Sequence, residues 1–207
     1  MLCRDSIKYF LELCHVYPHI EMLVVSKYVN DGVIKQIHQL TGWINFGENR
    51  VEVLEEKADG LKDLSLTWHF IGHLQSRKIK RIVRCADHIQ SVCREKELYL
   101  INQYAKAYGK VMRVWIQVND GQQQGRSGVC SVKVQRLVKL AHSLEHVALQ
   151  GLMLIPEKED IKAYENVNQL RLMLDPSFKI SAGMSDDHMI AIKNGSDMIR
   201  IGSALFI

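Results

Sequence analysis

The chain has 207 residues, of which 47% are hydrophobic and 24% charged, and its formal net charge is +4. This composition is typical of a globular protein with one large domain or two small ones, and it argues against a disordered or fibrous chain. No stretch approaches the roughly 20 apolar residues of a membrane span, and the amino-terminal segment has no long apolar run that would indicate a secretory signal. The mild positive charge gives only weak support to a nucleic-acid partner, since a small anionic ligand explains it equally well.

The cysteines and the linker composition narrow the class further. The five cysteines are odd in number and form no C-x-x-C pair, so we expect free thiols and a reducing, cytoplasmic location. The chain has three prolines and no Ser/Pro-rich linker. We therefore expect a single domain over residues 1–207.

Short apolar runs alternate with amphipathic segments along the whole chain. Strands are predicted at 22–26, 43–46, 66–71, 87–92, 111–118, 147–154, 177–180 and 197–201. Helices are predicted at 3–14, 30–41, 49–60, 75–85, 94–108, 131–144, 158–173 and 185–194, with a polar loop from Asn119 to Gly128. This alternation indicates parallel pairing, either in a closed (β/α)8 TIM barrel or in an open doubly wound sheet. We favour a compact α/β barrel, although the chain is close to the lower limit of about 200 residues for that fold.

The first predicted strand ends at Lys27. A lysine at a strand end can form a Schiff base with an aldehyde. In a barrel the carboxyl ends of the strands face the active mouth, so Lys27 would lie there. A surface lysine is the simpler reading of this residue taken alone.

The second and third predicted strands also end in polar residues. Glu48 and Asn49 follow the second strand and would point into the mouth, or else form a turn and helix cap. His69 and His73 have the i, i+4 spacing of a zinc-binding helix. However, their segment reads as a strand followed by a turn, and no third ligand is evident, so we expect no metal site. A histidine aimed at a ligand and a packed histidine both remain open.

A basic run, composed of Arg77, Lys78, Lys80, Arg81 and Arg84, lies on a predicted helix. Such a run can contact nucleic-acid phosphates. No aromatic residues interleave with it, so we interpret it as a solvated helix face and expect no nucleic-acid partner. The glycine-bearing loop at 122–128 lacks the Gly-Lys-Ser/Thr ending of a P-loop.

The loops after the last two predicted strands are small and contain glycine. Barrels often bind phosphate with these loops, which here are 181–185 and 202–203. The first also opens a predicted helix, whose amino terminus favours negative charge. Asp186 and Asp187 could be metal ligands or an acid pair, but a helix cap is the simpler interpretation. Closure of a barrel would bring Arg200 and these loops next to Lys27.

Taken together in order, these segments resemble the pyridoxal phosphate homeostasis (YggS/PROSC) family. The matching segments are Val25-Ser26-Lys27, Phe46-Gly47-Glu48-Asn49, His69-Phe70-Ile71-Gly72 with Leu74-Gln75, Gln117-Val118-Asn119, Ser127-Gly128, Gly151-Leu152-Met153, Gly183-Met184-Ser185-Asp186-Asp187 and Arg200-Ile201-Gly202-Ser203-Ala204. The chain departs from the family pattern at Tyr28 (usually Thr), Arg77 (usually Asn) and Ser203 (commonly Thr). Serine keeps the hydroxyl of threonine, so the phosphate site should be retained.

The resemblance implies a single barrel of the alanine racemase type that carries pyridoxal phosphate as a Schiff base on Lys27. It implies that Ser185, Gly202 and Ser203 bind the phosphate and that Arg200 faces the pyridine nitrogen. It also implies that the pocket is lined by Asn49, His69, Ser181 and Met184.

The function implied is cofactor holding in vitamin B6 homeostasis, without established turnover. Arginine only donates hydrogen bonds, so Arg200 disfavours the protonated pyridine that carbanion chemistry requires. We also expect no second domain that would supply a second acid or base, as in the two-domain racemases, because a barrel accounts for all 207 residues. We expect a monomer, with pyridoxal phosphate-dependent apo-enzymes as candidate recipients. The alternatives are an amino-acid racemase or decarboxylase that uses the same lysine and, less well supported, an interaction module based on the basic run.

Overall fold

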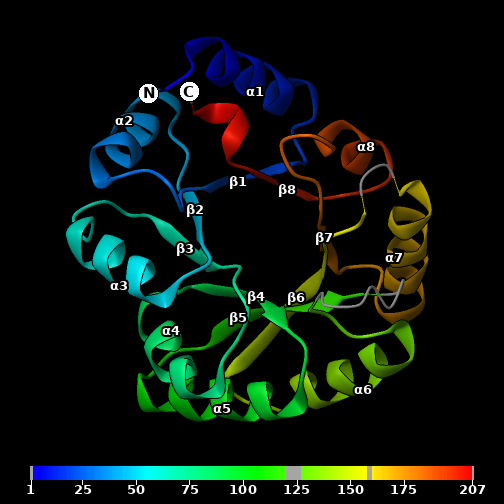
Figure 1. Cartoon of the computed structure of the whole chain (residues 1–207). Helices are drawn as coiled ribbons and strands as arrows, with labels where there is room; N and C mark the ends of the chain where they lie inside the picture. The colour runs from blue at the N-terminus through cyan, green and yellow to red at the C-terminus, as the bar shows by residue number, and fades with distance from the viewer. Residues whose placement is uncertain (1, 120–126, 158–159, 207) are drawn as a thin grey trace.

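Eight parallel strands close into one barrel in the computed structural model, which describes residues 2–119, 127–157 and 160–206 (Figure 1). The strands are β1 (Glu21–Val25), β2 (Asn45–Glu48), β3 (Thr67–Phe70), β4 (His88–Val92), β5 (Met112–Val118), β6 (Val147–Leu154), β7 (Lys179–Ser181) and β8 (Met198–Ile201). Each strand pairs with its neighbour in the chain, and β8 returns to β1 with Val24 opposite Ile201. The predicted TIM barrel is therefore confirmed, and the open sheet is excluded.

The helices form a ring outside the strands (Figure 1). They are α1 (Arg4–Val16), α2 (Asp31–Thr41), α3 (Val51–Gly60), α4 (Ile79–Cys85), α5 (Glu95–Ala107), α6 (Ser131–His142), α7 (Ile161–Leu174) and α8 (His188–Lys193), with short 3-10 helices η1 (Ser76–Lys78) and η2 (Ser203–Leu205). None of the described helices is long and apolar enough to cross a membrane.

Helix α2 shows why these segments are helical. Its buried residues Ile34 and Ile37 lie on one face, which packs on the barrel. Asn30 caps its amino terminus, where the Asn30 side chain accepts a hydrogen bond from Val33 N at 3.1 Å. The helix ends at Gly42, whose φ of 71° is the left-handed conformation that glycine adopts without a steric cost.

Two predicted helices differ from the structure. The segment predicted at 75–85 is divided into η1 and α4. The segment predicted to begin at Ser185 becomes helical only at His188, because a turn occupies the preceding residues. The part of the predicted polar loop from 120 to 126 lies outside the described residues.

The interior of the barrel is filled rather than hollow. A small apolar cluster inside it consists of Leu23, Trp115, Met153 and Met198, separate from the large core between strands and helices. Such filling is expected for an eight-stranded barrel, in which side chains occupy the central space. A binding site must therefore lie at a mouth of the barrel and not along its axis.

The two ends of the described chain meet beside β1 and β8. Leu2 forms an antiparallel bridge with Phe206, and Cys3 N donates to Leu205 O at 3.1 Å. Helix α1 thereby packs against η2 (Figure 1). The segment that follows β8 is fixed at the seam where the barrel closes.

Candidate functional site

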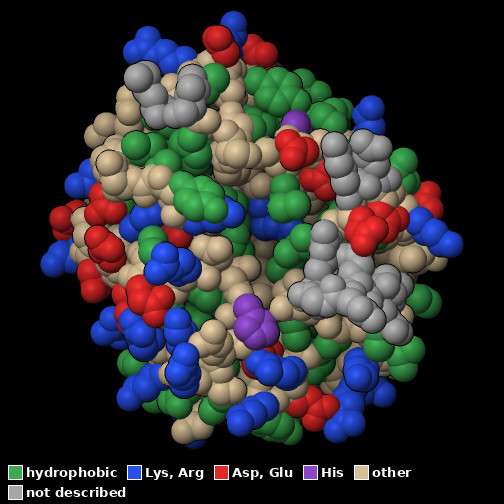
Figure 2. Space-filling model, in the orientation of Figure 1, with side chains coloured by type: hydrophobic (Ala, Val, Ile, Leu, Met, Phe, Trp, Pro, Cys, Tyr) green, Lys and Arg blue, Asp and Glu red, His purple; other side chains and the backbone are tan. Residues whose placement is uncertain are grey.

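A pocket of about 360 Å³ opens at the seam of the barrel, where the carboxyl ends of β1 and β8 lie side by side. Figure 2 shows a hollow near the centre of this face with Lys and Arg atoms inside it. The volume is within the range of roughly 300–1,000 Å³ that is usual for small-molecule sites. Its lining residues are Val25, Lys27, Tyr28, Asn49, Ile71, Met153, Ile155, Met184, Ser185, Asp186, Arg200, Gly202, Ser203 and Phe206.

Seven of the nine predicted site residues lie in this lining. They are Lys27, Asn49, Met184, Ser185, Arg200, Gly202 and Ser203. The juxtaposition on which the cofactor prediction depends, an early lysine beside the loop after the last strand, is present. The remaining two, His69 and Ser181, lie elsewhere.

Lys27 lies in a tight turn directly after β1. Val29 N donates to Ser26 O at 3.0 Å and closes this turn, so Lys27 and Tyr28 occupy its two central positions. The Lys27 amine lies 4.8 Å from the centre of the Tyr28 ring, which is 86% exposed. Lys27 is itself exposed, so its amine is accessible at the mouth, with one side against the aromatic ring of Tyr28.

Backbone N–H groups converge on the Ser185 hydroxyl at the opposite side of the pocket. Ser185 Oγ accepts from Gly202 N at 3.4 Å and from Ala204 N at 3.2 Å. A Cβ atom on Gly202 would lie 3.4 Å from both Val25 Cβ and Val25 O, so a side chain would fill the space between the two strand ends. Hydroxyl and N–H donors around an open space suit a phosphate group. Because α8 begins only at His188 and is short, the predicted contribution of its amino terminus to anion binding is not supported.

The loop that carries Ser185 is held by a buried carboxylate. Asp187 accepts hydrogen bonds from Met184 N and from the Tyr164 hydroxyl, both at 2.6 Å. Burial and the Asp187 carboxylate raise the pKa of Tyr164 above its ordinary value. Asp187 does occupy the N-cap position of α8, but its side chain makes no capping bond to that helix. It fixes the loop instead, while Asp186 faces the pocket.

Arg200 is a buried cation at the floor of the pocket, with only 4% of its surface exposed. Its Nη1 donates to Ser181 O at 2.6 Å and to Ser181 Oγ at 3.0 Å, and its Nη2 donates to Leu154 O at 2.8 Å. Burial lowers the pKa of Arg200 to about 10, so the guanidinium is still charged at neutral pH. Three acceptors hold it in one orientation, and its remaining N–H groups are available to the pocket.

Ser181 and His69 belong to a hydrogen-bonded chain beneath Arg200. Ser181 Oγ donates to Gln90 Oε1 at 2.7 Å, and Gln90 Nε2 lies 2.8 Å from His69 Nδ1. His69 Nε2 lies 3.2 Å from Asn45 Oδ1. Burial holds the pKa of His69 well below its ordinary value, so the ring is neutral with Nδ1 as acceptor and Nε2 as donor. The two residues thus lie behind Arg200 and do not line the pocket.

His69 and His73 do not form a zinc pair. His69 lies in β3 and is buried inside the barrel, where its ring stacks on His88 with centres 4.2 Å apart. His73 is exposed and its Nδ1 lies 3.0 Å from Ser127 Oγ. Within residues 2–119, 127–157 and 160–206, no group of three or more potential metal ligands was found.

Three of the five residues of the basic run form ion pairs with α3. Lys78 pairs with Glu52 at 2.9 Å, and Arg84 pairs with Glu55 at 3.1 Å. Arg81 binds Glu55 as well, through both its Nε and its Nη2. These ion pairs join two helices on an exposed face, in agreement with the interpretation of the run as a solvated helix face. The five basic residues share two carboxylates, Glu52 and Glu55, so ion pairing does not cancel the positive charge of the run.

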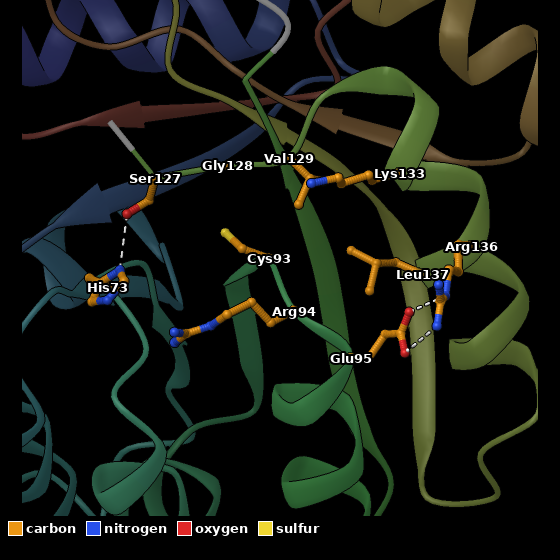
Figure 3. A pocket seen from close by; sticks show the side chains of 10 residues that line it. All are labelled: His73, Cys93, Arg94, Glu95, Ser127, Gly128, Val129, Lys133, Arg136 and Leu137. Carbon is orange, nitrogen blue, oxygen red and sulfur yellow. Dashed lines mark hydrogen bonds and ion pairs between the residues drawn. The ribbon is translucent and has the colours of Figure 1, made fainter. Parts of the chain in front are cut away.

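A second and larger cavity, of about 700 Å³, lies at the carboxyl ends of β3 to β5 (Figure 3). Its arginines are engaged with carboxylates. Arg136 donates to Glu95 at 3.1 Å, and Arg94 Nε donates to the buried Glu97 at 2.8 Å. Cys93 also lines it, but burial raises the pKa of this thiol to about 12, so it is protonated and unreactive.

Sequence reasoning did not find several residues of the first pocket. Among these, Val25, Ile71, Met153, Ile155 and Phe206 form its apolar wall. Their position in the sequence could have identified most of them, because four of the five lie within one residue of the carboxyl end of a predicted strand. It also missed Tyr164 and Gln90, which act from beneath the site and carry no sequence signal for that role.

The chain was compared with known proteins. The family model described as "Alanine racemase, N-terminal domain" matches residues 20–207. The pyridoxal phosphate homeostasis protein of Pasteurella multocida is 34% identical over 90% of this chain and 85% of its own length. That of Schizosaccharomyces pombe is 30% identical over 99% of this chain and 90% of its own length. The solved structure of PipY from Synechococcus elongatus with PLP bound superposes with a TM-score of 0.85, at 26% identity, covering 98% of this chain and all of PipY.

Proposed function

Because the chain belongs to the alanine racemase N-terminal domain family, and within it to the pyridoxal phosphate homeostasis proteins, we propose that it binds pyridoxal phosphate at the barrel seam and serves the homeostasis of this cofactor. The observation that carries the proposal is that one pocket holds both a lysine amine and a group of phosphate donors. Neither element alone would distinguish this site from an ordinary barrel mouth.

Each part of the cofactor has a suitable partner in the pocket. Lys27 Nζ is the amine to which the aldehyde would attach covalently. Ser185, Gly202 and Ser203 would hold the phosphate, and the N–H groups of Arg200 would face the pyridine nitrogen. Asn49 and Met184 would contact the ring or its substituents. His69 and Ser181 would act through Arg200, because they lie behind it.

When bound, pyridoxal phosphate supplies an aldehyde that condenses with amines and a ring that can withdraw electrons from them. The chain's residues favour holding over turnover. Arg200 is a fixed donor, and so it opposes protonation of a ring nitrogen placed against it. Besides Lys27 and Arg200, the titratable residues of the lining are Tyr28, which is in contact with Lys27, and Asp186. This set is poor for proton transfer on two faces of a substrate.

An amino-acid racemase-like activity is the alternative, and the family match to a racemase domain is what favours it. Proton exchange at the α-carbon tests it directly. Deuterium uptake from heavy water into added alanine or other amino acids, measured by mass spectrometry, should stay at the level of the Lys27→Ala variant. Sustained uptake that depends on Lys27 would support an enzyme.

The wider role is also part of the proposal. We infer that pyridoxal phosphate-dependent apo-enzymes receive the cofactor, that the chain acts as a monomer, and that it resides in the cytoplasm. The five cysteines, all of them free thiols in the structure, support a reducing location. Analytical ultracentrifugation tests the monomer, and reconstitution of an apo-enzyme by the loaded protein tests the transfer.

Borohydride trapping tests the central proposal. The protein is mixed with pyridoxal phosphate, reduced with borohydride and digested, and the labelled lysine is identified by mass spectrometry. We expect the label on Lys27 and a visible absorbance change that is lost in Lys27→Ala. Lys35→Ala, which removes an exposed lysine of α2, is the matched control and should label normally. A wild-type protein that takes up no label, or is labelled equally on many lysines, would contradict the proposal.

A further inference from the structure

A charged cluster lies buried directly beneath the Lys27 turn, where the site described above does not use it. Glu48 is fully buried at the end of β2, and Lys57 of α3 is 5% exposed. Lys57 Nζ lies 2.6 Å from Glu48 Oε1 and 2.6 Å from Ser26 O. Ser26 Oγ donates to the same Glu48 oxygen at 2.7 Å. The cluster ties α3 and β2 to the residue immediately before Lys27.

Stability alone does not account for this cluster. Removing two charges from water is costly, and apolar residues of similar size are often at least as stabilising as a buried ion pair. Glu48 Oε2 is buried without a hydrogen-bond partner among the described residues, which adds to the cost. An arrangement that is expensive to maintain therefore points to a role in what it holds in place.

What it holds is the backbone at Ser26. The Ser26 N–H donates to Gly47 O at 3.0 Å, and the Ser26 hydroxyl binds Glu48. The Ser26 carbonyl accepts from Val29 N, which closes the turn, and also from Lys57 Nζ. Every polar group of Ser26 is engaged, so the turn that carries Lys27 has little freedom to rotate.

Rotation of this turn would matter because Lys27 lies between two cavities. One is the pocket at the barrel seam. The other, of about 650 Å³, lies on the outer side of the turn. Lys27 and Lys57 line it together with the carboxylate-bearing residues Asp31 and Glu56. A lysine has a long and flexible side chain, and those carboxylates would attract its ammonium group. A loose turn would leave the amine free to enter the outer cavity.

We propose that Lys57 and Glu48 are positioning residues for Lys27: their buried ion pair fixes the Ser26 carbonyl and so directs the amine into the seam pocket and away from the outer cavity. This inference rests on the proposed function, because it concerns attachment of an aldehyde to Lys27. Neither residue touches the cofactor pocket, since both are absent from its lining.

The double variant Lys57→Met/Glu48→Gln tests the inference. It removes both charges together and leaves an amide oxygen to accept from the Ser26 hydroxyl, so no lone charge is left buried. Lys35→Met, at an exposed position of α2, is the matched control. Three quantities are measured for each protein. They are the thermal midpoint, the rate of borohydride-trapped attachment of pyridoxal phosphate to Lys27, and the affinity for deoxypyridoxine phosphate, which lacks the aldehyde.

We expect the attachment rate of the double variant to fall by about tenfold or more, because small misplacements of a reacting group have effects of this size. Its affinity for deoxypyridoxine phosphate should equal that of the wild type, because the phosphate donors are untouched. A folded double variant that attaches the cofactor at the wild-type rate would overturn the inference. So would a parallel loss of deoxypyridoxine phosphate affinity, which would indicate general damage to the site.

Two further measurements cover the cases in which the double variant does not fold or the proposed function fails. Should the double variant not fold, Glu48→Gln alone keeps the shape of the side chain and removes the charge that holds the Lys57 ammonium, and an unchanged attachment rate in it counts against the inference. The rate at which trinitrobenzenesulfonate modifies Lys27 is measured without cofactor. If the wild type attaches no pyridoxal phosphate, the proposed function fails, and a changed Lys27 reactivity in the double variant still reports on positioning.

Discussion

The seam pocket and the cavity of about 700 Å³ at β3 to β5 both contain basic side chains, but these side chains have different partners in the two places. In the larger cavity, Arg94 and Arg136 are each bound to a carboxylate. In the seam pocket, Arg200 is held by carbonyl and hydroxyl oxygens, and Lys27 rests on an aromatic ring. Among the described residues, no carboxylate forms an ion pair with either of these two cations. The two paired arginines of the larger cavity therefore have little to offer an anionic ligand, whatever the size of that cavity.

The largest expected effect separates the two cavities directly. Lys27→Ala should abolish borohydride-trapped attachment of pyridoxal phosphate, since no other lysine of residues 2–119, 127–157 and 160–206 lines the seam pocket. Lys133→Ala, in the larger cavity, should leave labelling unchanged. Peptide mapping by mass spectrometry provides the measurement. Label on Lys133, or its persistence in Lys27→Ala, would mean that the wrong cavity has been assigned.

The second effect concerns the interior below the two cavities, where His69 and His88 are stacked. Burial lowers the pKa of His88 from 6.5 to about 4, and that of His69 well below 6.5. Both rings therefore bind protons more readily in the unfolded chain once the pH falls below 6.5. The free energy of unfolding should be highest above pH 6.5. It should decrease as the pH falls towards 4, by roughly 3 kcal/mol for His88 alone.

Urea unfolding at a series of pH values measures this acid limb. His88→Gln should flatten it, because glutamine does not titrate. A free energy of unfolding that stays constant between pH 6.5 and 4 would show that the rings are not held neutral. The borohydride label at Lys27 should be retained in His88→Gln, since His88 is not part of the seam pocket.

A third effect concerns the loop of Ser185, which is proposed to help hold the phosphate in the seam pocket. Tyr164→Phe removes the hydroxyl that binds Asp187 but keeps the buried ring. We expect a loss of about 1.5–3 kcal/mol, the usual range for a hydrogen bond to a charged group, together with weaker binding of deoxypyridoxine phosphate. Calorimetry and ligand titration measure the two quantities. Tyr99→Phe, at an exposed position, should change neither.

The smallest effect is expected in the larger cavity. Arg136→Ala breaks an ion pair with Glu95 in which the arginine side chain is 78% exposed. Solvent screens such pairs, so the loss of stability should be below about 1 kcal/mol, with no change in cofactor binding. Denaturant unfolding and ligand titration provide the check. A clear loss of cofactor affinity in Arg136→Ala would mean that the two cavities are coupled.

The strand order and the contact of both chain ends at the seam could be predicted from sequence. Alternating apolar and amphipathic segments predict a parallel barrel, and closure of a barrel requires β8 to pair with β1. Lys27 lies two residues after β1 and Gly202 one residue after β8, so their proximity needs no knowledge of side-chain packing. The covalent attachment at Lys27 and the roles of the lining residues remain predictions that the experiments above test.

Depth within the barrel was harder to predict. Ser181 and His69 were expected in the lining, but the Ser181 hydroxyl at the end of β7 accepts from Arg200, and His69, the penultimate residue of β3, is bonded to Gln90 in the layer below. Along a strand, residues two apart share a face and differ by about 6.6 Å in height. Ile71, two residues after His69, is the residue that reaches the pocket.

The buried pair of Lys57 and Glu48 was also missed. Lys57 lies between acidic and small residues in the sequence and looks like a surface residue of an amphipathic helix. The signal that could have placed it is its spacing from the buried residues Val51 and Leu54, because positions three apart share one face of a helix. Helical spacing can show that a lysine faces inwards, but not which carboxylate it meets there.

The closure of β1 on β8 also sets the order of events during synthesis. Lys27 leaves the ribosome early, whereas Gly202 and Ala204 follow only after nearly all of the described chain has been translated. A nascent polypeptide therefore presents the amine of the proposed attachment before it has the N–H groups that are proposed to hold the phosphate. On this assignment the chain would retain the cofactor only after the barrel has closed. A chain with bound cofactor would therefore be one that has completed folding.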